Sequence, residues 1–234
     1  MSKAEKLDRL IADELQAALS GAIIGREIIV LEQTDSTNDA IWRVASDVLP
    51  STPEGLVVFA EHQADGRGQR GNRWESTAGK GLWFSILLRP EISLTDSGQL
   101  TIWAIEAIFD VIRSELGLEP VIKLPNDVRL NGRKVAGVLV EMRAQDDAPH
   151  VAVVGIGINV NQCGDDFPAE LQDRAISLAM ALGRQVERQN FAVALLRKLD
   201  LTYRDKFSKA AVAFNSFPAP TTTRDKRAAK FRRA

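Results

Sequence analysis

The sequence predicts an α+β protein of 234 residues, because several apolar strands are accompanied by two long amphipathic helices. Three apolar runs have the length and the β-branched content of strands, at residues 56–60, 81–88 and 151–160. Apolar residues recur at helical spacing over residues 97–116 and 191–207. The chain is long enough to bury a full core, as one large domain or two small ones.

Composition and charge limit the functions that the chain can have. Its hydrophobic content of 45% and charged content of 26% are ordinary for a soluble globular protein. The formal net charge is −1, but residues 224–234 carry six basic side chains and one acidic one, which leaves −6 on the remainder. An acidic body argues against nucleic-acid binding. No apolar run approaches the ~20 residues of a membrane span, and the polar N-terminus lacks a signal-peptide core, so we expect a cytoplasmic protein without a membrane partner.

The first part of the chain predicts a helix, a strand and a second helix. Apolar residues at helical spacing predict a helix over residues 2–20, capped by Ser2, and residues 28–31 form a short β-branched strand. The polar run 35–38 (Asp-Ser-Thr-Asn) then precedes a helical pattern. One such residue suffices for a cap, whereas four in succession also suit hydrogen bonds to a small polar ligand. Both interpretations stay open from the residues alone.

Glycine and arginine alternate in a loop between the strands at 56–60 and 81–88. This glycine–arginine loop, residues 66–73, contains Arg67, Arg70 and Arg73 among three glycines. Glycine lets the backbone approach a ligand closely, and guanidinium groups bind phosphate or carboxylate through paired hydrogen bonds. The pattern favours an anion-binding loop over its alternative, a solvated basic turn.

Residues 121–143 predict two strands joined by a tight turn at Asn131-Gly132. A lysine at a strand end is usually solvated. Here, however, Lys123, Asn126, Asp127 and Lys134 are expected at one end of the hairpin. These side chains suit a site that neutralises phosphate, coordinates Mg²⁺ and steadies a leaving group.

The last third predicts a central strand and two helices. Residues 151–160 are almost wholly apolar, as in a strand buried on both faces, but its glycines do not form a dinucleotide-binding fingerprint. Helical patterns follow at residues 177–182 and 191–207. We expect a folded domain over residues 1–210 and a flexible basic tail over residues 211–234.

Four separated motifs resemble those of biotin protein ligases in order and spacing, over residues 25–188. They are DSTN at 35–38, EHQADGRGQRGNRW at 61–74, KLPNDV with NGRKVAGVLVE at 123–141, and GIGINV at 155–160. The resemblance implies a catalytic domain similar to class II aminoacyl-tRNA synthetases, a mixed sheet backed by helices. It also implies an enzyme that activates biotin with ATP and Mg²⁺ to biotinyl-5'-AMP and transfers biotin to one lysine of a biotin carboxyl carrier domain. A lipoate- or octanoate-type acyltransferase and a non-catalytic binding relative are the alternatives.

The resemblance assigns a role to individual residues. The biotin-binding residues would be Ser36, Thr37, Asn38, Gln63, Gly66, Arg67, Gly68, Gln69, Lys134 and Gly137. The ATP-binding residues would be Arg67, Gln69, Arg70, Trp74, Lys123, Asn126 and Asn159. The catalytic residues would be Arg67, Lys123, Asp127 and Lys134, with Asp127 also a ligand of Mg²⁺.

The chain departs from the family pattern in several places. The pattern GRGRRGR-x-W has arginines where Gln69 and Asn72 stand, and a tryptophan where Leu124 stands. The resemblance assigns the arginine at position 69 to retention of the adenylate, so we expect weaker retention here. The 27 residues after Phe207 are too few for the family's C-terminal β-barrel domain, and we expect no DNA-binding domain before the first helix. Relatives are sometimes homodimers through a sheet edge, and the sequence leaves this open.

Overall fold

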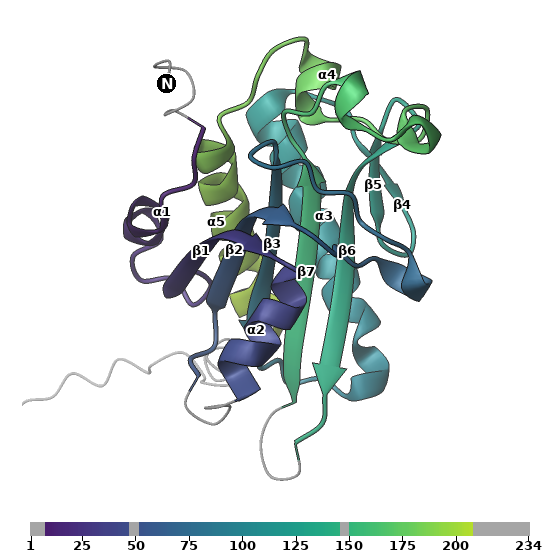
Figure 1. Cartoon of the computed structure of the whole chain (residues 1–234). Coiled ribbons are helices and arrows are strands. Elements are labelled where there is room, and N and C mark those ends of the chain that lie inside the picture. Colours follow the sequence, from purple (N-terminus) through teal and green to yellow (C-terminus); the bar gives the residue numbers. More distant parts are fainter. Residues whose placement is uncertain (1–7, 47–51, 146–149, 208–234) are drawn as a thin grey trace, which may run out of the picture.

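The computed structural model describes residues 8–46, 52–145 and 150–207. One mixed sheet of seven strands has the order β1-β2-β3-β7-β6-β5-β4 (Figure 1). The strands are β1 (Glu27–Thr34), β2 (Leu56–Gln63), β3 (Gly81–Leu88), β4 (Val121–Lys123), β5 (Asp127–Leu130), β6 (Arg133–Arg143) and β7 (Val151–Asn159). The helices are α1 (Ala12–Ala18), α2 (Thr37–Ser46), α3 (Gly98–Leu116), α4 (Leu178–Leu182) and α5 (Arg188–Phe207). Among these seven strands, β1 and β2 pair in parallel and the other neighbours pair antiparallel, and β7 is central, as its apolar sequence predicts.

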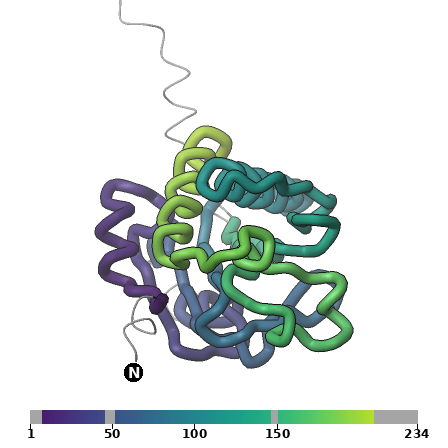
Figure 2. Tube along the Cα trace, turned by 90° about the horizontal axis from the view of Figure 1, so that it is seen from above, coloured from purple at the N-terminus to yellow at the C-terminus, as the bar shows by residue number. Residues whose placement is uncertain are grey.

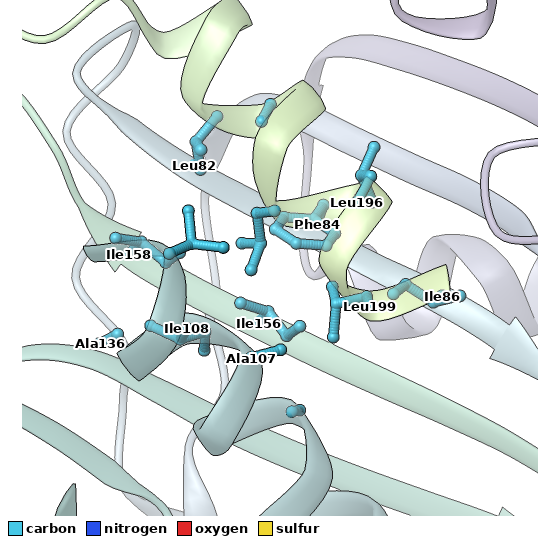
Figure 3. Close-up of a cluster of buried hydrophobic side chains, with 14 of the residues drawn as sticks. Leu82, Phe84, Ile86, Ala107, Ile108, Ala136, Ile156, Ile158, Leu196 and Leu199 are labelled. Atoms are coloured by element: carbon cyan, nitrogen blue, oxygen red, sulfur yellow. The ribbon is translucent and has the colours of Figure 1, made fainter. Parts of the chain in front are cut away.

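Two long helices cover one face of the sheet. Helices α3 and α5 lie side by side (Figure 2). The indole Nε1 of Trp103 in α3 donates to Thr202 Oγ1 in α5 at 2.8 Å. Trp103 is 1% exposed and belongs to the core. The even-numbered side chains of β3 and β7 meet these helices in the main core (Figure 3). The labelled members of this core are Leu82, Phe84, Ile86, Ala107, Ile108, Ala136, Ile156, Ile158, Leu196 and Leu199.

The opposite face of the sheet is covered only in part. Helix α2 packs Ala40, Ile41 and Ala45 against Val58 and Val153 in a second apolar cluster. Successive side chains of a strand point to opposite faces, so the positions of β7 that follow Val153 on this face are 155, 157 and 159. Two of them are glycines, and α2 reaches only the first of these, through Asn38 at its N-terminal end. This part of the sheet is therefore available as the floor of a binding site.

The prediction of a helix over residues 2–20 is wrong in its extent. Helix α1 begins at Ala12, and Ile11 before it is extended (φ −116°, ψ 110°). The backbone N–H of Leu10 donates to Glu61 Oε1 in β2 at 3.1 Å, in place of a helical backbone hydrogen bond. Ser2, its expected cap, lies outside the described residues.

The prediction of two strands over residues 121–143 is also wrong, because three strands form. A turn at Leu124–Asn126 separates β4 from β5 before the predicted turn at Asn131-Gly132 joins β5 to β6. Proline at position 125 has no N–H to donate to a strand ladder, which explains the interruption. Gly117 ends α3 with φ 65°, as expected of a C-cap glycine.

Two further expectations fall outside the described residues. The basic tail over residues 211–234 and the domain boundary at 210 stay predictions. Within residues 8–46, 52–145 and 150–207, no helix has both the length and the apolar content needed to cross a membrane.

A buried arginine joins the N-terminal segment, the sheet and α5. Arg188 is 2% exposed, and its Nη1 lies 2.7 Å from Glu61 Oε2 and 3.1 Å from the carbonyl oxygen of Gly81. Its Nε lies 3.1 Å from Asp8 Oδ1, and its Nη2 donates to the Asp8 carbonyl oxygen. Breaking a buried ion pair by removing one partner leaves the other charge uncompensated.

We therefore expect Arg188→Ala to lower the free energy of unfolding by about 3–5 kcal/mol, because Glu61 would stay buried without a cation. Urea denaturation followed by circular dichroism measures this. Arg113→Ala is the control, since its ion pair with Glu119 is exposed and should contribute less than about 1 kcal/mol. Equal effects of the two substitutions would contradict the role given to Arg188.

Candidate active site

A cavity of about 510 Å³ lies on the face of the sheet that α2 leaves open. Its floor comes from β6 and β7, one wall from the glycine–arginine loop, and the opposite wall from residues 167–175. The predicted site residues that line it are Ser36, Thr37, Asn38, Gln63, Arg67, Gly68, Gln69, Arg70, Trp74, Asn126, Asp127, Lys134, Gly137 and Asn159. Segments far apart in the chain are thus brought to one site.

Glycines in β7 make room for this cavity. A Cβ atom at Gly155 would overlap Asn38 Oδ1, and one at Gly157 would lie 2.5 Å from Trp74 Cε2. Asn159 follows on the same face and lines the cavity. These three alternate positions span roughly 13 Å, so the floor is long enough for an elongated ligand.

At Gly155 the cavity is lined by the uncharged polar side chains of Ser36, Thr37, Asn38 and Gln63, with Arg67 of the glycine–arginine loop also in the lining. The backbone N–H and the Oγ1 of Thr37 donate to Gln63 Oε1 at 2.9 and 3.2 Å. Ser85 Oγ lies 2.6 Å from Asn38 Oδ1, which uses the acceptor of that carboxamide. Asn38 Nδ2 is buried and has no hydrogen-bond partner among the described residues. A buried, unpaired N–H donor beside a cavity is suited to an acceptor on a ligand.

The polar run 35–38 therefore does more than cap α2. Thr37 is the first residue of α2, and its hydroxyl bonds to Gln63 in β2. Ser36, Thr37 and Asn38 all line the cavity and are at most 4% exposed. Of the two interpretations that the sequence left open, their position supports ligand contact.

A lysine and an indole occupy the middle of the cavity. Trp74 lies against the two glycines that β6 and β7 contribute, where a Cβ at Gly137 would be 2.9 Å from its Cζ3. Lys134 Nζ lies 5.0 Å from the centre of the Trp74 ring and 2.7 Å from Asp127 Oδ1. Asp127 is opposite Gly137 in the β5–β6 register, so the tight hairpin brings the carboxylate to this lysine.

The glycine–arginine loop is tightly folded. Gly68 N–H donates to the Asn72 carbonyl oxygen at 2.7 Å, and Asn72 Nδ2 donates to the Gln69 carbonyl oxygen at 2.8 Å. The side chain of Asn72 therefore stabilises the turn. Arg70 has φ 59°, a backbone conformation that residues other than glycine seldom adopt and that often marks a functional site.

The segment after β7 forms a wall that the sequence analysis did not predict. The Lys134 N–H donates to the Arg174 carbonyl oxygen at 2.7 Å, and the Ile176 N–H donates to the Lys134 carbonyl oxygen at 3.0 Å. This bridge brings Arg174 and Asp173 into the cavity wall. The sequence around Asp173 and Arg174 has no pattern that indicates a site. Their position in the wall depends on backbone hydrogen bonds to Lys134, which is distant in the chain.

A short polar contact anchors the start of that wall. Lys80 Nζ lies 2.6 Å from Asp166 Oδ2, and the N–H and Sγ of Cys163 also donate to this carboxylate. Burial by itself raises the pKa of Asp166, but the hydrogen bonds from Cys163 and Lys80 outweigh it and lower that pKa below its ordinary value. Asp166 therefore stays ionised and keeps its partners.

Two predicted residues lie outside the lining. Lys123 is exposed and lies on β4, where its backbone is opposite Asp127 in the β4–β5 register. The turn at 124–126 places it on a separate strand from Lys134. Gly66 lies next to the wall, where an added Cβ would overlap the Trp74 carbonyl oxygen. No group of three or more His, Cys, Asp or Glu suited to a metal ion occurs in the described parts of the chain.

Positive charge is in excess around the cavity. Six basic side chains line it against three acidic ones, so the described lining has a net charge of +3. The basic residues are Arg67, Arg70, Arg73, Arg129, Lys134 and Arg174, and the acidic ones are Glu75, Asp127 and Asp173. The fold and the site therefore have the features of an α+β protein that binds small anionic molecules.

Comparison with known proteins identifies the family. A model of the biotin/lipoate A/B protein ligase family matches residues 30–159. The bifunctional ligase/repressor BirA of Bacillus spizizenii is 37% identical over 201 residues, which cover 86% of this chain and 61% of that protein. The biotin–[acetyl-CoA-carboxylase] ligase of Mycobacterium tuberculosis is 34% identical over 198 residues, with 82% and 69% covered. The chain belongs to the biotin/lipoate A/B protein ligase family.

The fold agrees with a solved structure in the same family. The biotin protein ligase from Aquifex aeolicus in complex with biotin and ATP has a TM-score of 0.63 and 28% identity, over 76% of this chain and 71% of that one. The expected mixed sheet backed by helices is thereby confirmed. The chain spans 61% of the length of its Bacillus relative.

We expect Gly157→Ala to impair ligand binding, because its Cβ would displace Trp74 from the cavity floor. Isothermal titration with ATP should show at least about tenfold weaker binding, the effect of roughly 1.4 kcal/mol. Gly164→Ala is the matched control, since nothing lies within 4 Å of its added Cβ. Unchanged affinity in Gly157→Ala would contradict the assignment of this floor.

Proposed function

We propose that this protein is an ATP-dependent biotin protein ligase. It activates biotin to biotinyl-5'-AMP and transfers the biotin to a lysine of a biotin carboxyl carrier domain. The observation that carries this proposal is one cavity with a floor about 13 Å long, which has the uncharged polar side chains of residues 36–38 at one end and Lys134 in its middle. A relative 28% identical to the chain is in complex with biotin and ATP, which supports the same ligands here.

The polar end suits the neutral ureido ring of biotin. A ureido group offers one carbonyl acceptor and two N–H donors, and it carries no charge. The buried Nδ2 of Asn38 would donate to its oxygen, with Ser36, Thr37 and Gln63 beside it. Gly66 and Gly68 would let the glycine–arginine loop lie close over the ring.

The cationic centre suits the reaction between two anions. A carboxylate oxygen of biotin attacks the α-phosphorus of ATP, the bond to the β-phosphate oxygen breaks, and pyrophosphate leaves. Lys134 would hold the carboxylate and the α-phosphate together and stabilise the charge that develops as they join. Trp74 and Asn159 would contact the adenosine, and Gln69, Arg70 and Asn126 would face the phosphates.

The second step consumes the mixed anhydride. The neutral amine of the acceptor lysine attacks its carbonyl carbon, an amide bond forms, and AMP leaves with the electron pair of the broken bond. The attacking amine loses a proton, and the carboxylate of Asp127, which lies beside Lys134, would accept it. Lys123 is exposed on β4 and is better placed for the incoming carrier domain than for the phosphates.

A magnesium ion would be held mainly by the nucleotide. Mg²⁺ in such sites takes one or two carboxylates together with substrate phosphates and water. Asp127 fits this requirement, because its carboxylate lines the cavity beside Lys134. When bound, the ion would neutralise phosphate charge.

We expect Lys134→Ala to lower the rate of biotin transfer by on the order of 100-fold or more, since a cation aimed at the reacting charge would be lost. Transfer of labelled biotin to a carboxylase carrier domain measures this, with lipoate as the competing substrate. Lys206→Ala is the control, as that lysine pairs with Glu106 at 2.8 Å between α3 and α5. Label transfer that persists in Lys134→Ala would refute the role of this lysine, and preferential transfer of lipoate would refute the choice of substrate.

We expect Gln69→Arg to slow the release of free biotinyl-5'-AMP. Gln69 lines the cavity without charge, whereas arginine at this position would add a cation next to the phosphate. Single-turnover reactions without acceptor, in which released and bound adenylate are separated by rapid filtration, measure the change. Equal release from the wild type and the variant would show that Gln69 does not limit retention.

A further inference from the structure

Arg67 is held by two carboxylates from different parts of the fold. Its Nη2 lies 2.7 Å from Asp39 Oδ1 in α2, and its Nη1 lies 2.9 Å from Glu141 Oε1 in β6. The side chain therefore joins the glycine–arginine loop to a helix and to the sheet at once. The sequence analysis identified neither carboxylate as part of the site.

The acceptor on β6 is itself fixed in place. The other oxygen of Glu141, Oε2, accepts a hydrogen bond from Trp42 Nε1 at 2.9 Å. Trp42 is 6% exposed in α2, and the guanidinium of Arg143 lies 3.8 Å from the centre of its ring. Glu141 thus binds α2 with one oxygen and Arg67 with the other, so the contact with Trp42 orients the carboxylate that Arg67 binds.

These anchors lie near the polar end of the cavity. Asp39 follows Asn38 directly, and Asn38 Oδ1 lies over Gly155. Glu141 comes two residues after Leu139, which is opposite Gly155 in the β6–β7 register. A side chain that bridges Asp39 and Glu141 therefore crosses the end of the cavity where Asn38 presents its unpaired donor.

The electrostatics of this bridge do not suit a phosphate. Both ends of the Arg67 guanidinium already bind carboxylates, so the group of three has a net charge of −1. An anionic ligand would have to displace them. Lys134, which faces a single close carboxylate at 2.7 Å, is the better partner for the reacting anions.

We propose that Asp39 and Glu141 are positioning residues that hold the glycine–arginine loop closed over the biotin end of the cavity by binding Arg67. That the retained ligand is biotin rests on the proposed function. The restraint of the loop rests only on the two ion pairs of Arg67. In this arrangement Arg67 acts by restraining the loop, and the loss of either carboxylate lets the loop open more often.

Two isosteric substitutions test the proposal in the ligand-free, full-length protein. Asp39→Asn and Glu141→Gln remove the charges, and the glutamine can still accept the Trp42 hydrogen bond through its amide oxygen. Half-exposed ion pairs each contribute modestly, so we expect the double variant to exchange the amide hydrogens of residues 66–74 about five- to tenfold faster. Glu106→Gln, which removes a remote ion pair, is the control and should leave this exchange unchanged.

A third substitution separates action through Arg67 from a general loosening of α2. In an Arg67→Ala background, the same two changes should have no further effect on exchange at residues 66–74. Additive effects there, or exchange in the original double variant equal to that of the wild type, would overturn the proposal.

Biotin dissociation gives the functional measurement. The double variant should release biotin about five- to tenfold faster than the wild type, with a smaller change in the rate of pyrophosphate formation at saturating biotin. Faster loop exchange with unaltered biotin release would refute the placement of the loop over the ligand. A wild type that binds no biotin would refute the proposed function, while the exchange experiment would still decide whether the two carboxylates hold the loop.

Discussion

The alternation of side chains along β7 is the constraint on which the rest of the structure depends. Val154, Ile156 and Ile158 point into the core beneath α3 and α5. The positions between them, from Gly155 to Asn159, face the cavity. Because a strand has only two faces, a single short segment supplies both the apolar core and the floor of the site. A change of register by one residue would exchange the two and destroy both.

The floor of the cavity depends on two glycines of β7, which have no side chain to fill the space above the sheet. The space that a Cβ would take at Gly155 and Gly157 is used by Asn38 and Trp74, which come from α2 and from the chain just after the glycine–arginine loop. The site is thus built by inserting polar and aromatic groups from elsewhere into gaps in the sheet. Two of these groups have a buried N–H donor with no hydrogen-bond partner among the described residues, Asn38 Nδ2 and Trp74 Nε1.

The cations of the site are held before any ligand arrives. Lys134 is paired with Asp127, and Arg67 is paired with Asp39 and Glu141. Clustered positive charges repel one another, and nearby carboxylates reduce that repulsion while fixing the side chains. Groups that are already oriented need little reorganisation when charge develops in a reaction. The excess of basic over acidic lining residues still leaves the cavity attractive to a carboxylate and a triphosphate.

Elements whose pattern is local could be predicted from the sequence. The periodicity of residues 97–116, the apolar run of β7 and the turn at Asn131-Gly132 each depend on neighbours in the chain, and all three were predicted correctly. The tertiary structure was needed to show that Leu10 stays outside α1 and bonds to Glu61, how Arg174 joins the cavity wall, and which carboxylates bind Arg67. Those contacts join segments distant in the chain, and no local spacing or propensity encodes a pairing that exists only after the sheet has formed.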